Sequence, residues 1–178
     1  MQEKLPGSLS KNQLIDQILR VNYAGEYGAK RIYEGQLAVL KSGKASKIIE
    51  HMKEQEIVHM NYFQKEIINQ HARPSILYPL WHVGGFALGA FSAILGEKYA
   101  FACTVAVEEV IADHYQEQLN KLDPESELSH KISKFRDEEI EHHDISIENK
   151  AKDAPFFRLF SNTIKIGCKI AITLAKRY

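Results

Sequence analysis

Residues 52–63 of the chain read MKEQEIVHMNYF, and this stretch predicts both a helix and what the helix carries. Spacings of three and four residues place four side chains on one helical face: Met52, Glu56, His59 and Phe63. That face is apolar except for the Glu-x-x-His pair formed by Glu56 and His59. On a protein surface, such a pair would lie opposite the apolar stripe. We therefore interpret the pair as buried and functional.

The same arrangement recurs toward the other end of the chain. Glu139 and His142 form a second Glu-x-x-His pair, again on the apolar stripe of its own helix. Glu26 interrupts another apolar stripe 30 residues before Glu56. Glu108 does so 31 residues before Glu139. The chain therefore reads as two helix pairs, each of the form Glu followed by Glu-x-x-His.

Four carboxylates that converge in a bundle core are costly without counter-charge. Two divalent cations would balance them. Carboxylate oxygen and imidazole nitrogen suit iron or manganese, whereas calcium avoids histidine and structural zinc usually recruits thiolates. One Glu from each of two helices, with a Glu-x-x-His from each of two others, is the ligand set of ferritin-like di-metal proteins. The candidate metal ligands are Glu26, Glu56, His59, Glu108, Glu139 and His142.

Three further features lie close to these positions. Glu127 and His130 form a third Glu-x-x-His pair, but it falls at the start of a helix with no matching acid upstream. We do not count it as a ligand pair. Tyr115 follows one candidate acid by seven residues, so it is either a core tyrosine or a catalytic residue beside the metals. Glu138 and Glu141 are expected to point to solvent.

Helical periodicity runs through most of the chain, and no alternating pattern of useful length predicts a strand. Ser10 and Gln13 form the capping-box pattern that begins a helix. The predicted helices span residues 11 to about 42, 45–70, 97–121 and 125–149, with a shorter helix after Pro155. We expect an all-α protein: a ferritin-like four-helix bundle with an apolar crossover segment and an extra C-terminal helix. Residues 1–178 are expected to form a single ferritin-like di-metal domain.

The crossover segment, residues 74–96, contains no Asp, Glu, Lys or Arg. It could span a bilayer, pack as an apolar crossover inside the bundle or an oligomer, or form a broken membrane-immersed hairpin or interfacial helix. Pro79 and the pair Gly84-Gly85 are expected to interrupt it. Gly85 and Gly89 form a small-xxx-small pair, which allows close approach of another helix.

The composition excludes several functions. Lys plus Arg and Asp plus Glu each number 23, so the net charge of zero argues against a nucleic-acid partner. The two cysteines form no disulfide framework and fit a reduced compartment. Residues 1–13 show no apolar or Arg-rich presequence, so we expect no secretory signal. The chain carries no GxGxxG motif or Walker loop and is not expected to bind its own flavin or nucleotide tightly.

Five motifs resemble one family, the demethoxyubiquinone hydroxylases of aerobic ubiquinone biosynthesis. They are RVNYAGEYGAKRIYEGQLAVL (20–40), EQEIVH (54–59), GGFALGAFSAILG (84–96), ACTVAVEEVIADHYQEQL (102–119) and KFRDEEIEHHD (134–144). The resemblance implies a ferritin-like di-iron monooxygenase, whose iron ligands fall on the same six residues. One departure is Asn22-Tyr23, where the family pattern has Asp-His. It leaves the ligand set unchanged.

The resemblance implies that two Fe ions per chain and O2 as co-substrate hydroxylate the ring of a polyprenylated demethoxyubiquinol. Electrons would come from an external donor, either NADH or a reductase. Expected partners are the quinol, the membrane surface, other ubiquinone-biosynthesis proteins and a second copy of the chain. The implied location is peripheral, on the cytoplasmic face of a bacterial membrane or the matrix face of the mitochondrial inner membrane. The alternatives are a ferritin-like iron-storage protein or another di-metal enzyme, a peroxidase or catalase.

Overall fold

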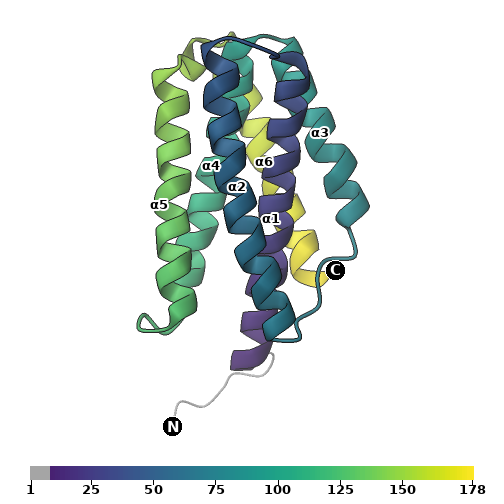
Figure 1. Ribbon diagram of the computed structural model, residues 1–178, viewed down its shortest axis with the longest axis vertical. Helices are drawn as coiled ribbons and strands as arrows, with labels where there is room; N and C mark the ends of the chain where they lie inside the picture. Colours follow the sequence, from purple (N-terminus) through teal and green to yellow (C-terminus); the bar gives the residue numbers. More distant parts are fainter. Residues whose placement is uncertain (1–8) are drawn as a thin grey trace.

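The computed structural model describes residues 9–178, which form six α-helices, one short 3-10 helix and no strand (Figure 1). Residues 1–8, on which the expectation about a secretory signal largely rests, lie outside the described range. Within that range the expected all-α, ferritin-like architecture is confirmed.

Four long helices form the bundle: α1 (Lys11–Val39), α2 (Lys44–Asn69), α4 (Glu97–Leu119) and α5 (Glu127–Glu148). Their ends lie within a few residues of the predicted ones. The capping box at the start of α1 is present, because the Ser10 side chain accepts from the Gln13 N–H and the Gln13 side chain accepts from the Ser10 N–H. Buried apolar side chains of these helices fill the space above and below a polar centre.

The crossover segment contains one continuous helix, α3 (Tyr78–Ile94), which lies against the outer side of α1 (Figure 1). The predicted interruption at Gly84-Gly85 is therefore wrong, and so is the hairpin. Pro79 occupies the first turn of the helix, where its missing N–H costs nothing. Glycines inside a helix cost roughly 1 kcal/mol each, and packing of α3 against α1 offsets that cost.

That packing is as close as backbones allow. A Cβ atom at Gly89 would lie 1.9 Å from the carbonyl oxygen of Ile32. A Cβ atom at Gly35 would lie 2.2 Å from the carbonyl oxygen of Phe86. The predicted role of Gly85 and Gly89 in close helix approach is confirmed, and Gly35 contributes from the α1 side.

The extra C-terminal helix is α6 (Phe157–Arg177), which follows the 3-10 helix η1 (Ala151–Asp153) and packs on α4 and α1. Arg20 of α1 fixes its end, because the guanidinium donates to the carbonyl oxygens of Ala175 at 3.1 Å and Lys176 at 3.2 Å. A cation is favourable at a helix C-terminus, where carbonyl groups lack helical partners. The N–H of Ile76 donates to the carbonyl of Tyr178 at 2.7 Å and ties in the approach to α3.

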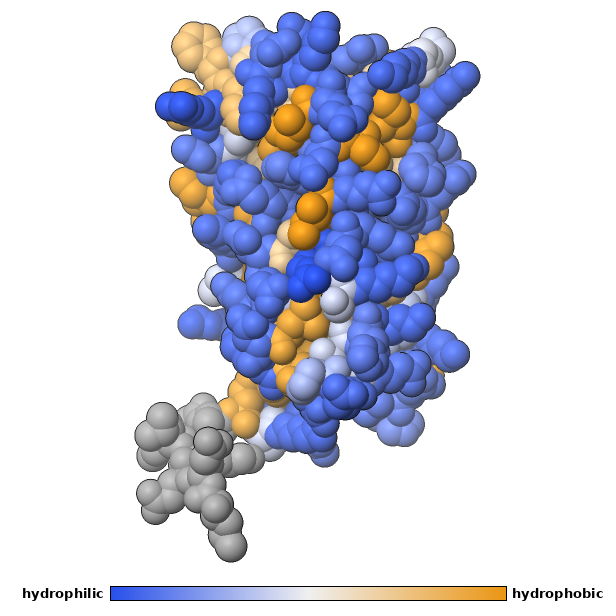
Figure 2. Space-filling view, turned by 90° about the vertical axis from the view of Figure 1, so that its left-hand side faces the viewer, coloured by the Kyte–Doolittle hydropathy of each residue, from blue (hydrophilic) through white to orange (hydrophobic). Residues whose placement is uncertain are grey.

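The two sides of the molecule differ in surface character. The side that carries α5 is mostly hydrophilic (Figure 2). On the other side, α3 and α6 expose large apolar side chains: Leu80, Val83, Phe91, Ile94, Leu159, Ile166 and Ile170. Among the described helices, none is both long enough and apolar enough to cross a membrane, as a transmembrane span over residues 74–96 would require.

Candidate metal centre

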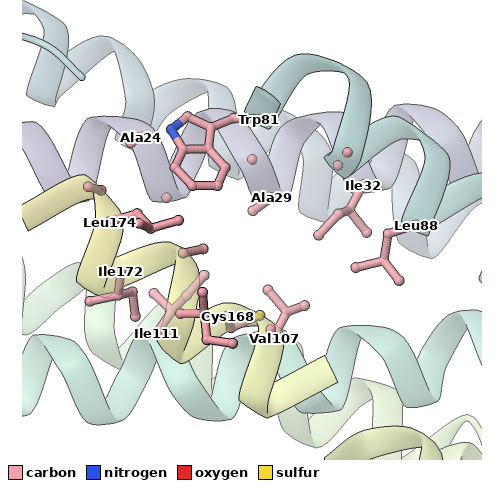
Figure 3. A pocket seen from close by; sticks show the side chains of 18 of the residues that line it. Ala24, Ala29, Ile32, Trp81, Leu88, Val107, Ile111, Cys168, Ile172 and Leu174 are labelled. Atoms are coloured by element: carbon pink, nitrogen blue, oxygen red, sulfur yellow. The ribbon is translucent and has the colours of Figure 1, made fainter. Parts of the chain in front are cut away.

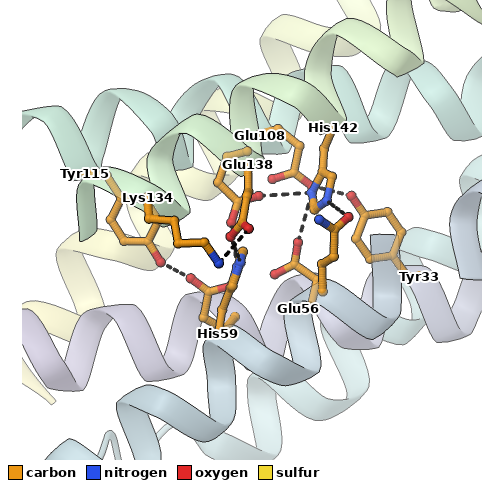
Figure 4. A network of polar contacts seen from close by, with 11 residues as sticks. Tyr33, Glu56, His59, Glu108, Tyr115, Lys134, Glu138 and His142 are labelled. Carbon is orange, nitrogen blue, oxygen red and sulfur yellow. Dashed lines mark hydrogen bonds and ion pairs between the residues drawn. The ribbon is translucent and has the colours of Figure 1, made fainter. Parts of the chain in front are cut away.

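The six predicted ligands meet in the middle of the bundle, brought there by four different helices (Figure 4). Each is at most 1% exposed. Helices α1 and α4 supply one carboxylate each, and α2 and α5 supply one Glu-x-x-His pair each. The i, i+3 spacing turns both members of a pair to the same side, so the local helix geometry places them toward the centre.

The donor atoms fall into two groups that could each hold one cation. In each group, the atoms lie within 4.8 Å of one another. The first position comprises Glu26, Glu56, His59 and Glu139. The second position comprises Glu56, Glu108, Glu139 and His142. Glu56 and Glu139 belong to both, so each could contribute to holding both cations.

Eight buried oxygen and nitrogen atoms of these six residues have no hydrogen-bond partner. The Nδ1 atom of His59 lies 3.0 Å from a Glu139 oxygen, and that of His142 lies 3.2 Å from the other, but neither contact has hydrogen-bond geometry. Unpartnered buried polar atoms are costly and rare in proteins. Oxygen and imidazole donors aimed at shared points fit two iron or manganese ions.

The pKa values of the candidate ligands also indicate that cations would stabilise this cluster. Burial raises the pKa values of Glu26, Glu56 and Glu108 well above the ordinary range, and the charge of Glu139 raises them further. Burial acts on Glu139 in the same direction, but contacts with the two histidines outweigh it and lower its pKa to about 2. Contacts with carboxylates raise the pKa of His142 to about 11 against the effect of burial. Divalent cations would displace these protons.

Two tyrosines each donate a hydrogen bond to a candidate ligand of another helix. Tyr115 of α4 donates to Glu26 of α1, and Tyr33 of α1 donates to Glu108 of α4. Both tyrosines are 1% exposed. Tyr115 was among the predicted site residues, but Tyr33 was not. The signal was available, because Tyr33 follows Glu26 by the same seven residues that separate Tyr115 from Glu108.

A further pair of contacts lies behind the histidines. The Nε2 atom of His59 is 2.8 Å from a carboxylate oxygen of Glu138, and that of His142 is 3.0 Å from the side-chain oxygen of Gln55. The expectation that Glu138 points to solvent is therefore wrong. Glu138 is only partly exposed, because α5 turns this position toward α2. Glu141 is exposed, as expected.

The third Glu-x-x-His pair stays apart from the centre. Glu127 and His130 are both exposed in the first turn of α5, and neither belongs to a group of candidate ligands. This placement agrees with leaving them out of the candidate ligands.

An apolar hollow of about 480 Å³ adjoins the centre between α1, α3, α4 and α6 (Figure 3). Gly25 and Ala24 of α1 line it beside Glu26, and Val107 of α4 lines it beside Glu108. Trp81 closes one side from α3. The opposite wall comes from α6, through Ile164, Cys168, Ile172 and Leu174. A cavity of this size and lining suits an apolar ligand.

A second hollow, the polar cleft, lies between α4 and α5 and also measures about 480 Å³. Its lining includes Glu109, Asp113 and Asp137. The candidate ligand Glu108 reaches its wall. The centre therefore lies between an apolar hollow and a polar one.

Comparisons with known proteins identify the family of the chain. The sequence pattern of the family described as "Ubiquinone biosynthesis protein COQ7" matches residues 13–175. A 3-demethoxyubiquinol 3-hydroxylase of Rhodospirillum rubrum is 51% identical to the chain, over 99% of the chain and 84% of the relative. An NADPH-dependent 3-demethoxyubiquinone 3-hydroxylase, mitochondrial, of Homo sapiens is 49% identical, over 92% and 77%. A 5-demethoxyubiquinone hydroxylase, mitochondrial, of Saccharomyces cerevisiae is 38% identical, over 92% and 78%. The chain therefore belongs to the ubiquinone biosynthesis protein COQ7 family.

Proposed function

We propose that this protein is a di-iron monooxygenase that hydroxylates the ring of a polyprenylated demethoxyubiquinol, with O2 as co-substrate. The observation that carries the proposal is a buried centre of four carboxylates and two histidines, together with an apolar hollow lined by the sequence neighbours of Glu26 and Glu108. The names of the relatives in Rhodospirillum rubrum and Homo sapiens support the substrate class. We also propose that residues 1–178 act as a single domain, since each helix packs on the one bundle.

The six candidate ligands would hold the two irons, whose part in the reaction is to activate O2. The protein's own contribution is to fix the carboxylates and exclude water. The Tyr33 hydroxyl donates to one oxygen of Glu108, and the Tyr115 hydroxyl donates to one oxygen of Glu26. The other oxygen of each carboxylate has no hydrogen-bond partner and is left for a cation. We propose that Tyr115 also serves as a catalytic residue that holds or moves a proton at Glu26.

The apolar hollow would orient the substrate. Its wall carries apolar side chains and glycines, which suit an isoprenoid tail but offer little to a polar ring. Gly25 lies next to Glu26, and a Cβ atom there would meet nothing within 4 Å. The quinol ring would thus be held beside the α1 and α4 carboxylates, with its tail extending between α3 and α6.

Two of the exposed apolar side chains of α3 and α6, Leu80 and Ile170, also line this hollow. We propose that the exposed apolar side chains of both helices rest on the membrane surface. Such a placement would let a lipid-soluble substrate enter without crossing water. Val83 of α3 is 66% exposed and Val58 of α2 is 60% exposed, so they offer a matched test. Val83→Asp is expected to lower binding to liposomes, and Val58→Asp is expected to leave it unchanged. Equal binding by both variants in a flotation assay would contradict the proposal.

Electrons must reach the centre from outside the chain. The relative in Homo sapiens is named as NADPH-dependent, which supports a reduced nicotinamide as the donor. This agrees with the sequence, which has no tight nucleotide-binding motif.

The test is hydroxylation of a demethoxyubiquinol by iron-loaded protein under ¹⁸O-labelled dioxygen with a chemical reductant. We expect one labelled oxygen in the ring of the product, and accumulation of demethoxyubiquinone in cells that lack the protein. Label that comes only from water, or normal ubiquinone in such cells without a second hydroxylase, would contradict the proposal. The relatives support this function and not the iron-storage alternative.

A further inference from the structure

The two halves of the bundle repeat one pattern of side chains. In α1 and α4, each candidate ligand is followed seven residues later by a tyrosine, Tyr33 after Glu26 and Tyr115 after Glu108. Each tyrosine donates to the carboxylate of the other half. The repeat gives the first and second positions the same kinds of ligand and the same tyrosine contact.

One pair of corresponding residues breaks the repeat. The residue before each Glu-x-x-His pair is Gln55 in α2 and Glu138 in α5. Each contacts the histidine of the opposite helix. His59 of the first position lies 2.8 Å from a carboxylate oxygen of Glu138, and His142 of the second position lies 3.0 Å from the amide oxygen of Gln55.

The two ring nitrogens of each histidine have separate tasks. Both Nδ1 atoms are buried, point to the centre and have no hydrogen-bond partner. Nδ1 is therefore the atom that each ring offers to a cation, and Nε2 carries the hydrogen that it donates outward. The residue that accepts this hydrogen acts on the ligand through the ring.

A carboxylate and an amide act differently in that place. A hydrogen bond to a charged acceptor is roughly twice as strong as one between neutral groups, and it raises the electron density on the opposite nitrogen. Glu138 also pairs with Lys134 at 3.0 Å, but the Lys134 side chain is 64% exposed, so water screens its charge. His59 should therefore be the stronger donor to a cation.

The two positions also differ in how close they lie to the polar cleft. Glu108, which belongs only to the second position, reaches the wall of the polar cleft. Glu26, which belongs only to the first position, does not line that cleft. The second position thus has a ligand in the wall of a polar cleft, whereas the ligand found only in the first position does not line it.

We propose that Glu138 makes the first position the tighter of the two, so that it takes up a divalent cation before the second. The inference rests on the proposed metal centre. Glu138 is a positioning residue, since it acts on the cation only through His59. Loss of such a partner lowers metal affinity about 10- to 100-fold in known sites.

Variants that keep one position each separate this effect from repulsion between two bound cations. Glu108→Ala retains the ligands of the first position, and Glu26→Ala retains those of the second. Each is combined with Glu138→Gln, and Co²⁺ binding is measured by calorimetry and visible absorption. Glu141→Gln removes the same charge from an exposed site on the same helix and serves as the control. Circular dichroism checks that the helices are retained.

We expect Glu138→Gln to weaken Co²⁺ binding about 10- to 100-fold in the Glu108→Ala protein and by no more than about threefold in the Glu26→Ala protein. The reciprocal change, Gln55→Glu, should tighten binding in the Glu26→Ala protein. Glu141→Gln should change neither. Should a single-position protein bind no Co²⁺, the same variants in the unaltered centre decide: Glu138→Gln should move the tighter step, and Gln55→Glu the weaker one.

Equal effects of Glu138→Gln at both positions would overturn the inference, because they would reduce Glu138 to a general charge. So would the absence of any effect. Failure of the unaltered protein to bind two Co²⁺ ions would overturn the metal centre itself, which distinguishes the two failures.

Discussion

The apolar hollow and the polar cleft lie on different faces of the same helix, α4, and each measures about 480 Å³. Val107 and Ile111 of α4 line the apolar hollow. Glu109 and Asp113, two residues further along in each case, line the polar cleft. Two hollows on one helix can therefore differ in chemistry because a helix turns successive residues in different directions.

This difference suggests how the centre is supplied. Under the proposed function, an oily substrate approaches from the side of α3 and α6, whereas water and ions approach between α4 and α5. The candidate ligand Glu108 lies between the two. One helix thereby keeps the two routes apart without a dedicated gate.

The contrast between the two hollows matters for function only if the centre between them binds cations. Glu56 and Glu139 belong to both positions, so the double variant Glu56→Ala/Glu139→Ala is expected to lose both irons. Metal analysis after reconstitution with Fe²⁺ measures this, with circular dichroism as the check on folding. The control is Glu127→Ala/His130→Ala, which alters the exposed third pair and should keep a full load. A full load in the first variant would refute the ligand assignment.

Neighbouring residues of α4 test the contrast between the hollows directly. Ile111 lines the apolar hollow and Ala112 lines the polar cleft. Ile111→Asp would place an unpaired charge among apolar groups, and should lower the free energy of unfolding by about 2 kcal/mol or more. Ala112→Asp should change it by less than about 0.5 kcal/mol. Denaturant unfolding measures both, and equal losses would show that the hollows do not differ as described.

Two glycines sharpen the description of the apolar side. Gly89→Ala would force α3 away from α1 and should lower the free energy of unfolding by about 1–3 kcal/mol. Gly25→Ala should raise it by about 0.5–1 kcal/mol, because a Cβ atom there meets nothing and alanine favours the helix. Thermal unfolding monitored by circular dichroism measures both changes. A stability gain in Gly89→Ala would contradict the close approach of α3 to α1.

The smallest expected effect is a loss of stability at acidic pH. Burial lowers the pKa of His114 from 6.5 to about 4, and the charge of Lys176 in α6 acts in the same direction. The unfolded chain therefore binds a proton more readily, so stability is lost as the pH falls from about 6.5 toward 4. Between pH 7 and pH 6, the loss due to His114 should be less than about 1 kcal/mol. Unfolding curves of the protein and of His114→Gln measure the difference. Parallel pH profiles would contradict a neutral, buried His114.

The bundle and the six candidate ligands could be predicted from the sequence for two reasons. A helical period fixes which residues share a face, and an acid on an apolar face needs a counter-charge. Glu26 and Glu108 satisfied both conditions, and the structure brings them together with the two Glu-x-x-His pairs. Their role as metal ligands stays a prediction.

What sequence could not supply was the pairing of residues between helices. Glu138 looks like any surface acid on α5, and only the register of α5 against α2 places it behind His59. The continuity of α3 through Gly84-Gly85 depends in the same way on its contact with α1. The low helix propensity of two adjacent glycines predicts a break in the helix. Packing against α1, which is distant in sequence, keeps the helix continuous.

The division of each cation position between the two helix pairs has a consequence for how the chain folds. The α1–α2 and α4–α5 hairpins are closed by short connections, so each can form early from local contacts. Neither hairpin alone contains all four ligands of either position. A cation can therefore gain its full set of ligands only after the hairpins have docked, late on the folding route. Its stabilising effect should appear mainly as slower unfolding and leave the folding rate almost unchanged.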